Sequence, residues 1–402
     1  MNSIDISKKA SKTSSVTNSC LRVLFVSHTY VVGVNQGKLN AIAATGQATV
    51  GLLVPAKWQA LAWGKRFEIE KPYPNIQIYP AKVWFEGKVG AYIYPPWVIQ
   101  QAIADFCPDI IQVEQEVFSV SAFEVALWAR FTGKPLVLFC WENRERKLSN
   151  FRTRLRQFVL NTAQLIVAGN LEGEELLRRW GYTGLIEVMP QMGVDTALFN
   201  PRLRQPKNHQ QLIIGFVGRL AHHKGIDILI AAVSQLRDRG HECQVVLCGS
   251  GPDEELLRQE AQKHNVADLI VWRGGVRHDE VPQEMSKFDV LVLPSRSVPD
   301  WKEQFGHVLI EAMAMGIPAI GSNCGEIPNV IGRPDLVFSE GDARQLAAIL
   351  ERMICDLAWR QELEQDSLDR ARQHYTHERI AERSLDLWRK AIEQKKISGG
   401  RQ

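Results

Sequence analysis

Short apolar runs rich in Val, Leu and Ile recur along the chain and alternate with longer amphipathic stretches. The first run, residues 21–27, reads LRVLFVS and lacks the polar–apolar alternation of a half-exposed strand. Such runs are typical of strands buried on both faces of a parallel sheet. In the first half of the chain the pattern predicts further strands at 48–54, 110–113, 136–139 and 165–168, and helices at 117–131 and 150–160.

The pattern breaks at residues 200–211 (NPRLRQPKNHQQ), which are polar, contain two prolines and are interpreted as a linker. The alternation then restarts, with strands expected at 212–217, 243–248, 269–272, 289–294 and 318–321, and helices at 225–238 and 253–264. Strand–helix repeats predict parallel sheets with right-handed crossovers. We therefore expect an α/β protein with two Rossmann-like domains, over 20–199 and 212–375, followed by a C-terminal helix and tail at 376–402.

The last helix, about 377–393, carries apolar Ile380, Leu385, Leu387 and Trp388, but the sequence does not indicate the domain on which it packs. Residues 1–19 are rich in Ser, Thr, Lys and Asn and are predicted to be a disordered tail.

Composition narrows the class of protein. The 402 residues exceed what one core usually organises, and 45% hydrophobic with 23% charged residues is ordinary globular composition. The formal charge of +3 gives no reason to expect a nucleic-acid partner. No Cys-x-x-Cys pair, long apolar run or secretory signal occurs, so a cytoplasmic protein without a zinc site is expected.

Candidate chemistry follows two strands of the second domain, because open parallel sheets bind ligands at the carboxyl ends of their strands. After strand 212–217 comes a short loop with Arg219 and Lys224, which leads into a helix at Gly225. Two cations and a helix N-terminus suit a diphosphate. Taken alone, Arg and Lys beside a turn are usually solvated surface cations, so this segment by itself does not define a phosphate site.

A second group follows strand 289–294. Glu303 stands in a loop before a helix at about 306–315, and Glu311 lies within that helix. A carboxylate can accept two hydrogen bonds from sugar hydroxyls. Two glutamates eight residues apart carry no meaning by themselves.

The combination of segments is informative. From Gly215 to Val330 the chain contains GFVGRLAHHKGIDILIAA, VVLCGSGPDEELL, FDVLVLPS, EQFGHVLIEAMAMGIPAI and SNCGEIPNVI, in this order. These segments resemble the donor domain of the family 4 retaining glycosyltransferases, which have the GT-B fold. Glu303 and Glu311 match that family's Glu-x7-Glu motif.

The resemblance implies a role for each matched residue. Arg219 and Lys224 would contact the donor diphosphate, Glu311 the ribose and Glu303 the donor sugar, so that Glu303, Arg219 and Lys224 form the catalytic set. Backbone N–H groups at Phe305, Gly306 and His307 would meet the sugar or distal phosphate, and the backbone at Val276 would read the base. The donor would be a UDP- or GDP-sugar, transferred with retention.

No two aspartates stand two residues apart, so the Asp-x-Asp metal site of other glycosyltransferases is not present in the sequence. We expect no metal and no cofactor, with Arg219 and Lys224 stabilising the leaving diphosphate. Retention by front-face departure and attack needs no protein nucleophile, so Glu303 is not assigned that role. His222 and His223 are interpreted as loop histidines.

The first domain should bind the acceptor, and its match to the family is weaker. Gly33, in the loop after the first strand, fits either close approach to a donor phosphate or an ordinary loop position. His28 fits a cleft ligand or a structural histidine. Glu114 and Glu116, after strand 110–113, fit either acceptor contacts or structural carboxylates.

Residues 144–160 combine six cations with interleaved apolar residues. This pattern fits a helix lying on the inner face of an anionic membrane, and equally a solvated helix that packs on the core. The leading functional hypothesis is a transferase that glycosylates a glycan or lipid-linked acceptor in cell-surface polysaccharide assembly. The alternatives are transfer to a small sugar or sugar phosphate, and a non-catalytic nucleotide-binding or scaffolding protein.

Overall fold

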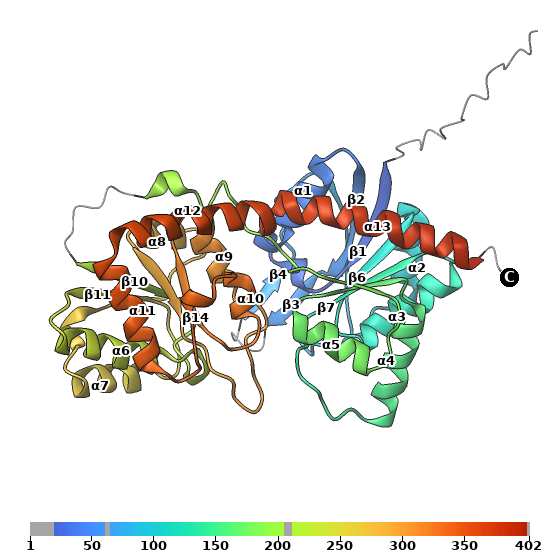
Figure 1. Ribbon diagram of the computed structural model, residues 1–402. Coiled ribbons are helices and arrows are strands. Elements are labelled where there is room, and N and C mark those ends of the chain that lie inside the picture. Colours follow the sequence, from blue (N-terminus) through green and yellow to red (C-terminus); the bar gives the residue numbers. More distant parts are fainter. Residues whose placement is uncertain (1–19, 61–64, 205–210, 400–402) are drawn as a thin grey trace, which may run out of the picture.

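The computed structural model describes residues 20–60, 65–204 and 211–399, and shows two α/β domains side by side (Figure 1). The predicted tail at 1–19, residues 205–210 of the predicted linker and residues 400–402 lie outside the described residues. None of the described helices is long and apolar enough to cross a bilayer.

The first domain is built on a seven-stranded parallel sheet in the order β5-β2-β1-β6-β7-β8-β9. The strands are β1 Leu21–Val26, β2 Ala48–Pro55, β5 Ile76–Ala81, β6 Ile110–Glu114, β7 Leu136–Cys140, β8 Leu165–Ala168 and β9 Leu185–Val188. Its helices are α1 Gly37–Ala44, α2 Pro96–Phe106, α3 Val120–Phe131, α4 Asn150–Thr162 and α5 Leu171–Arg179. Every residue of β6, β7 and β8 is buried, as expected for strands covered on both faces.

The second domain has a six-stranded parallel sheet in the order β12-β11-β10-β13-β14-β15. Its strands are β10 Leu212–Val217, β11 Cys243–Cys248, β12 Ile270–Gly274, β13 Val290–Leu293, β14 Ala319–Ser322 and β15 Val337–Phe338. Its helices are α6 Ile226–Asp238, α7 Glu254–Lys263, α8 Val281–Met285, α9 His307–Ala314, α10 Ile327–Ile331, α11 Ala343–Cys355 and α12 Leu357–His374.

Both sheets reverse their winding direction once. The switch lies between β1 and β6 in the first domain and between β10 and β13 in the second. Loops that leave neighbouring strands at a switch point diverge and leave a crevice for a ligand. The loops after β10 and β13 carry Lys224 and Glu303, so the topology brings these two predicted site residues together.

The chain passes between the domains earlier than the sequence predicts. Met189 packs in the first core, whereas Val194 already packs in the second. At the crossing, the N–H of Val194 donates to the carbonyl of Tyr375 at 2.7 Å, and a Cβ at Gly193 would overlap the backbone of Thr376. The described part of the predicted linker 200–211 contains a short 3-10 helix, Pro201–Leu203, and Leu203 packs on the second core.

The C-terminal helix α13 (His377–Gly399) crosses back and packs on the first domain (Figure 1). Its apolar residues Ile380, Leu385, Leu387 and Trp388 join the first core, where the Trp388 ring meets Phe25 edge-on at 5.7 Å between ring centroids. The helix that follows the second domain is therefore part of the first, and two chain crossings connect the domains.

An antiparallel hairpin, β3 (Lys57–Ala60) and β4 (Lys65–Glu68), projects from the first domain between the two sheets (Figure 1). Trp58 on β3 is buried and stacks on His28 at 4.5 Å between ring centroids. The hairpin thus covers the end of β1 on the side that faces the second domain.

Candidate active site

A cavity of about 680 Å³ opens at the carboxyl ends of β10, β11 and β12. It is lined by Val217, Gly218, Arg219, Cys248, Gly249, Ser250, Gly251, Pro252, Gly275 and Val276. The structure therefore places Arg219 and Val276, which lie far apart in the sequence, in one cavity. Arg219 is exposed, and within the described ranges its guanidinium has no hydrogen-bond or ion-pair partner. An unpaired guanidinium beside a hollow of this size is available to an anionic ligand.

Lys224 lies at the switch point. It ends a 3-10 turn, and Gly225, at φ 68°, caps the start of α6. A Cβ at Gly225 would overlap the carbonyl of Pro294, so glycine lets the loops after β10 and β13 touch. The Nζ atom of Lys224 lies 2.7 Å from Oε2 of Glu303 and 4.7 Å from the ring centroid of Trp301. The cation is thus held beside the predicted sugar-binding carboxylate.

Glu303 is held firmly in place. It is only 7% exposed, and besides Lys224 its Oε2 accepts a hydrogen bond from Ser295 Oγ at 3.0 Å. Its carbonyl accepts from the amide of Asn143 in the first domain, at 3.3 Å. The sequence analysis did not identify Ser295, Trp301 or Asn143; for Ser295 the available signal was its position directly after a buried strand.

Further contacts join the two domains around Glu303. Lys302 forms an ion pair with Glu172, and Arg144 donates to the carbonyl of Pro299. The N–H of Leu171, in the first turn of α5, donates to Oε2 of Glu326 at 3.0 Å. The loop that carries Glu303 is therefore fixed from both domains.

A second cavity, of about 230 Å³, lies between the domains. Its lining combines residues of the first domain with the loop that opens α9, namely Phe139, Trp141, Gly169, Pro190, Gln191, Glu303, Gln304, Phe305, Gly306 and His307. Gly306, at φ 83°, is the N-cap of α9. Phe305, Gly306 and His307, whose backbone N–H groups the family resemblance assigns to the sugar or phosphate, thus line this cavity at the start of α9.

Glu311 lies on α9, and its Oε1 is 3.2 Å from Nε2 of His278, in the loop after β12. The hydrogen bond with Glu311 raises the pKa of His278 above its ordinary value. Glu311 thus faces the loop that begins with Gly275 and Val276, beside the larger cavity. The sequence analysis missed His278.

His28 lies at the switch point of the first domain. Its Nδ1 is 2.7 Å from Nε2 of Gln115, across the gap between β1 and β6, and its ring packs on Trp58 and Tyr92. Burial lowers the pKa of His28 to about 4. The imidazole is therefore neutral near pH 7, and because Gln115 donates to Nδ1, the proton is assigned to Nε2.

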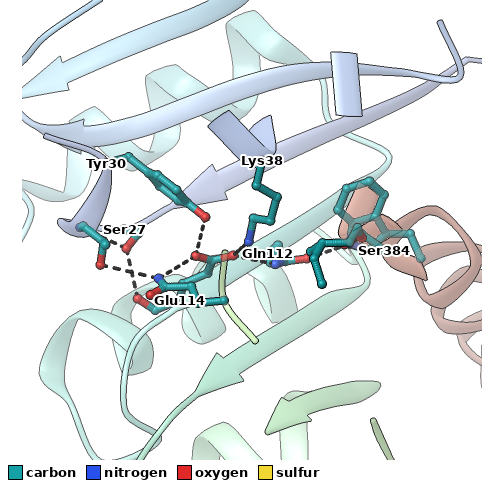
Figure 2. Close-up of polar contacts among 10 residues, drawn as sticks. Ser27, Tyr30, Lys38, Gln112, Glu114 and Ser384 are labelled. Carbon is teal, nitrogen blue, oxygen red and sulfur yellow. Dashed lines mark hydrogen bonds and ion pairs between the residues drawn. The ribbon is translucent and has the colours of Figure 1, made fainter. Parts of the chain in front are cut away.

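Three first-domain residues fit the structural one of the two alternatives that the sequence left open. Glu114 is fully buried among polar contacts (Figure 2), so the acceptor-contact alternative is wrong for this residue. The N–H of Gly33 donates to Oε2 of Glu70 at 2.6 Å, so in this structure it is not free for a phosphate. Glu116 is 8% exposed and accepts from the N–H of Trp141, which fits a structural carboxylate rather than an acceptor ligand.

The pKa of Glu116 shows the effect of this burial. Desolvation, reinforced by the nearby charge of Glu142, raises the pKa of Glu116 to about 8. Glu142 itself is buried and paired with Arg146. Within the part of the chain that the structure describes, no three His, Cys, Asp or Glu side chains are grouped as metal ligands would be.

Comparison with known proteins agrees with this geometry. Residues 200–372 match the family model described as glycosyl transferases group 1, a span that contains all four motif residues Arg219, Lys224, Glu303 and Glu311. Over this domain, which is less than half of the chain, the sequence is similar to the group 1 glycosyltransferases.

Two relatives illustrate the range of proteins that match. The 2-deoxystreptamine glucosyltransferase of Streptomyces kanamyceticus is 32% identical over 148 residues, which cover 36% of this chain and 37% of the relative. The GDP-mannose-dependent alpha-(1-6)-phosphatidylinositol monomannoside mannosyltransferase of Mycobacterium tuberculosis is 30% identical over 243 residues, 57% of this chain and 63% of the relative. The chain thus spans less than two thirds of the length of either protein.

Solved structures establish the fold over nearly the whole chain. A sucrose-phosphate synthase from Thermosynechococcus elongatus superposes with a TM-score of 0.68 at 21% identity, covering 93% of this chain and 99% of the other. Anabaena HepE in complex with UDP gives a TM-score of 0.68 at 17% identity, with coverages of 92% and 99%. The predicted GT-B fold is confirmed.

Proposed function

We propose that this protein is a retaining glycosyltransferase that moves a sugar from a UDP- or GDP-sugar to a glycan or lipid-linked acceptor in cell-surface polysaccharide assembly. The observation that carries this proposal is the Lys224–Glu303 pair, which stands between a cavity suited to a nucleotide and a smaller one suited to a sugar. Several relatives are named as glycosyltransferases of glycolipids or polysaccharides, which supports the class of acceptor.

The geometry supports separate binding positions for the parts of the donor along the cleft. The base and ribose occupy the larger cavity, next to Val276 and Glu311. The diphosphate lies at Arg219 and Lys224, and the sugar extends toward Glu303 and the first turn of α9. Cleavage of the glycosyl–phosphate bond leaves negative charge on the diphosphate, and the fixed cations stabilise that charge as it develops.

Two features of the chemistry follow as proposals. The cations supply the charge stabilisation that a divalent metal gives in other transferases, so no metal is required. Glu303 is already bonded to Lys224 and Ser295, which suits it to hold a sugar hydroxyl. The acceptor hydroxyl attacks on the face from which the diphosphate leaves, and the departing phosphate takes its proton, so that the configuration is retained without a protein nucleophile.

A donor panel tests this function. Wild-type protein is incubated with UDP-, GDP- and ADP-sugars and a set of glycan and glycolipid acceptors, with and without EDTA. We expect transfer from one class of donor, at the same rate in EDTA, with the anomeric configuration retained. Loss of activity on chelation would overturn the metal-independent mechanism. Nucleotide binding without transfer or hydrolysis over the whole panel would instead favour a non-catalytic role.

We further propose that the first domain rests on an anionic membrane. The apolar residues Leu155 and Val159 of α4 pack into the domain, so they are not membrane contacts. Beside α4, however, Trp84, Phe85, Val89 and Trp97 are all more than half exposed. Arg152 of α4 joins the two features by donating to the carbonyl of Gly90. Exposed Trp and Phe flanked by the cations of 144–160 fit a lipid headgroup layer.

Vesicle co-sedimentation tests the membrane proposal. Vesicles with anionic lipid should retain the protein at low salt and release it at high salt, because the cations are screened. Trp84→Ala/Trp97→Ala should weaken retention, whereas Leu256→Ala, which removes an equally exposed apolar side chain in the second domain (55% exposed), should not. Equal retention of all three proteins, or none by wild type, contradicts the proposal.

A further inference from the structure

The carboxylate of Glu114 is buried inside the first domain and receives four hydrogen bonds (Figure 2). Its Oε1 accepts from Lys38 Nζ at 2.6 Å and from Gln112 Nε2 at 2.7 Å. Its Oε2 accepts from the Tyr30 hydroxyl at 2.6 Å and from Gln191 Nε2 at 2.8 Å. A carboxylate offers about four acceptor positions, so this one is saturated and only donors can face it.

Each partner of Glu114 is fixed in turn. Burial lowers the pKa of Lys38 and the carboxylate opposes that effect, while burial and the carboxylate together raise the pKa of Tyr30. The indole Nε1 of Trp388, on α13, donates to Oε1 of Gln112 at 2.7 Å, which fixes the orientation of that amide. The network therefore ties the C-terminal helix to the sheet and holds the Glu114 carboxylate in one place.

Gln191 connects this network to the cleft. It comes from the crossing segment after β9 and lines the interdomain cavity together with Glu303 and His307. Its NH₂ group faces Glu114 and also lies 3.5 Å from Thr29 Oγ1. The reversed amide would set its carbonyl oxygen against a carboxylate, which is repulsive. The carbonyl oxygen Oε1 therefore faces away from Glu114; within the described residues it makes no hydrogen bond, and it is not a buried atom.

We propose that Gln191 is a specificity-determining residue that accepts a hydrogen bond, through Oε1, from one hydroxyl of the transferred sugar. Glu114 is a positioning residue, because it fixes the amide so that only an acceptor faces the cavity. This inference rests on the proposed function, since it names how the same site recognises its sugar. The sequence shows no motif for it, because Lys38 and Gln191, two of the partners of Glu114, are 76 and 77 residues away along the chain.

The chemistry predicts the kind of sugar that is rejected. An amide oxygen accepts but cannot donate, so it recognises a hydroxyl by its proton. A deoxy sugar lacks that group, and a fluoro sugar has an acceptor in its place. Either change leaves Oε1 without a partner once the sugar fills the cavity and excludes water, which costs binding energy.

The test uses the full chain and the donor sugar that the panel identifies, with its monodeoxy and monofluoro analogues. For wild type, kcat/KM should fall about 10-fold or more at one position of the ring. For Gln191→Met, kcat/KM with the parent donor should fall by a similar factor. Removing the hydroxyl at that position should then cause no further decrease in kcat/KM. The matched control is Gln262→Met, an exposed glutamine on α7, which should behave as wild type.

A second variant tests the positioning role. In Glu114→Gln the side chain at position 114 can both donate and accept, so the Gln191 amide is free to reverse. Discrimination between the parent donor and its deoxy analogue at that ring position should therefore fall. UDP or GDP alone should bind this variant as tightly as wild type. Full discrimination by Gln191→Met overturns the inference, and full discrimination by a folded Glu114→Gln overturns the positioning role. Failure of the wild type to bind any nucleotide would instead count against the proposed function, so the two failures are distinguishable.

Discussion

Replacing Lys224 with Met should lower kcat/KM for sugar transfer by about 10²- to 10³-fold, the effect of removing one preorganised charge from a developing anion. The cation lies where the loops after β10 and β13 meet, at 2.7 Å from Glu303. We expect Arg219, which lines the neighbouring cavity, to support the activity that remains.

Steady-state kinetics with the identified donor measure this effect. Lys263→Met is the control, because Lys263 lies on α7 with a side chain that is 71% exposed and should give wild-type rates. Thermal unfolding must accompany the kinetics, since loss of Lys224 leaves the buried Glu303 with Ser295 as its remaining side-chain partner. A folded Lys224→Met protein with more than a tenth of wild-type kcat/KM contradicts the assignment.

Replacing Lys38 with Met should destabilise the protein by about 3–5 kcal/mol, because it leaves the Glu114 carboxylate buried without its counter-ion. Both side chains of the pair are almost completely buried, at 2% and 0% exposure, so water cannot compensate for the loss. For a domain of this size the midpoint of thermal unfolding should fall by roughly 10 °C.

The exposed pair Lys57–Glu68 provides the control, with side chains 50% and 73% exposed. Lys57→Met should cost less than about 1 kcal/mol. The double variant Lys38→Met/Glu114→Leu should recover part of the loss, since no buried charge remains, although Tyr30 and Gln191 lose their acceptor. If Lys38→Met unfolds at the same temperature as Lys57→Met, the Lys38–Glu114 pair contributes little to stability. The network around Glu114 is then not a rigid support.

The central strands of both sheets are predictable from sequence because they are buried on both faces and appear as unbroken apolar runs. The strands that the sequence analysis missed lie at the sheet edges. β5 contains Pro80 and exposed Gln77, β9 is only partly buried, and β15 is two residues long. A strand with one neighbour need not be apolar throughout, so the pattern does not indicate it.

The candidate site likewise contains residues that the sequence predicts and residues that it does not. Arg219, Lys224, Glu303 and Glu311 lie in short segments that follow strand ends, and the structure places them in one region. Glu114 was expected after strand 110–113 as either an acceptor contact or a structural carboxylate, and it is the buried last residue of β6. Its partners Lys38, Tyr30 and Gln191, like Glu70 beside Gly33, come from distant parts of the chain, and no local pattern shows which side chain will face the core.

The central claim is that the donor nucleotide binds the second domain, without metal, through the ends of β10–β13. It is tested most directly by calorimetric titration of UDP, GDP and ADP into wild type and Glu311→Ala in EDTA, which needs no acceptor. We predict that UDP or GDP binds, and that Glu311→Ala weakens this binding at least about 10-fold, because the carboxylate would accept hydrogen bonds from the ribose hydroxyls. Absence of binding by all three nucleotides, or equal affinity of wild type and Glu311→Ala, would contradict the claim.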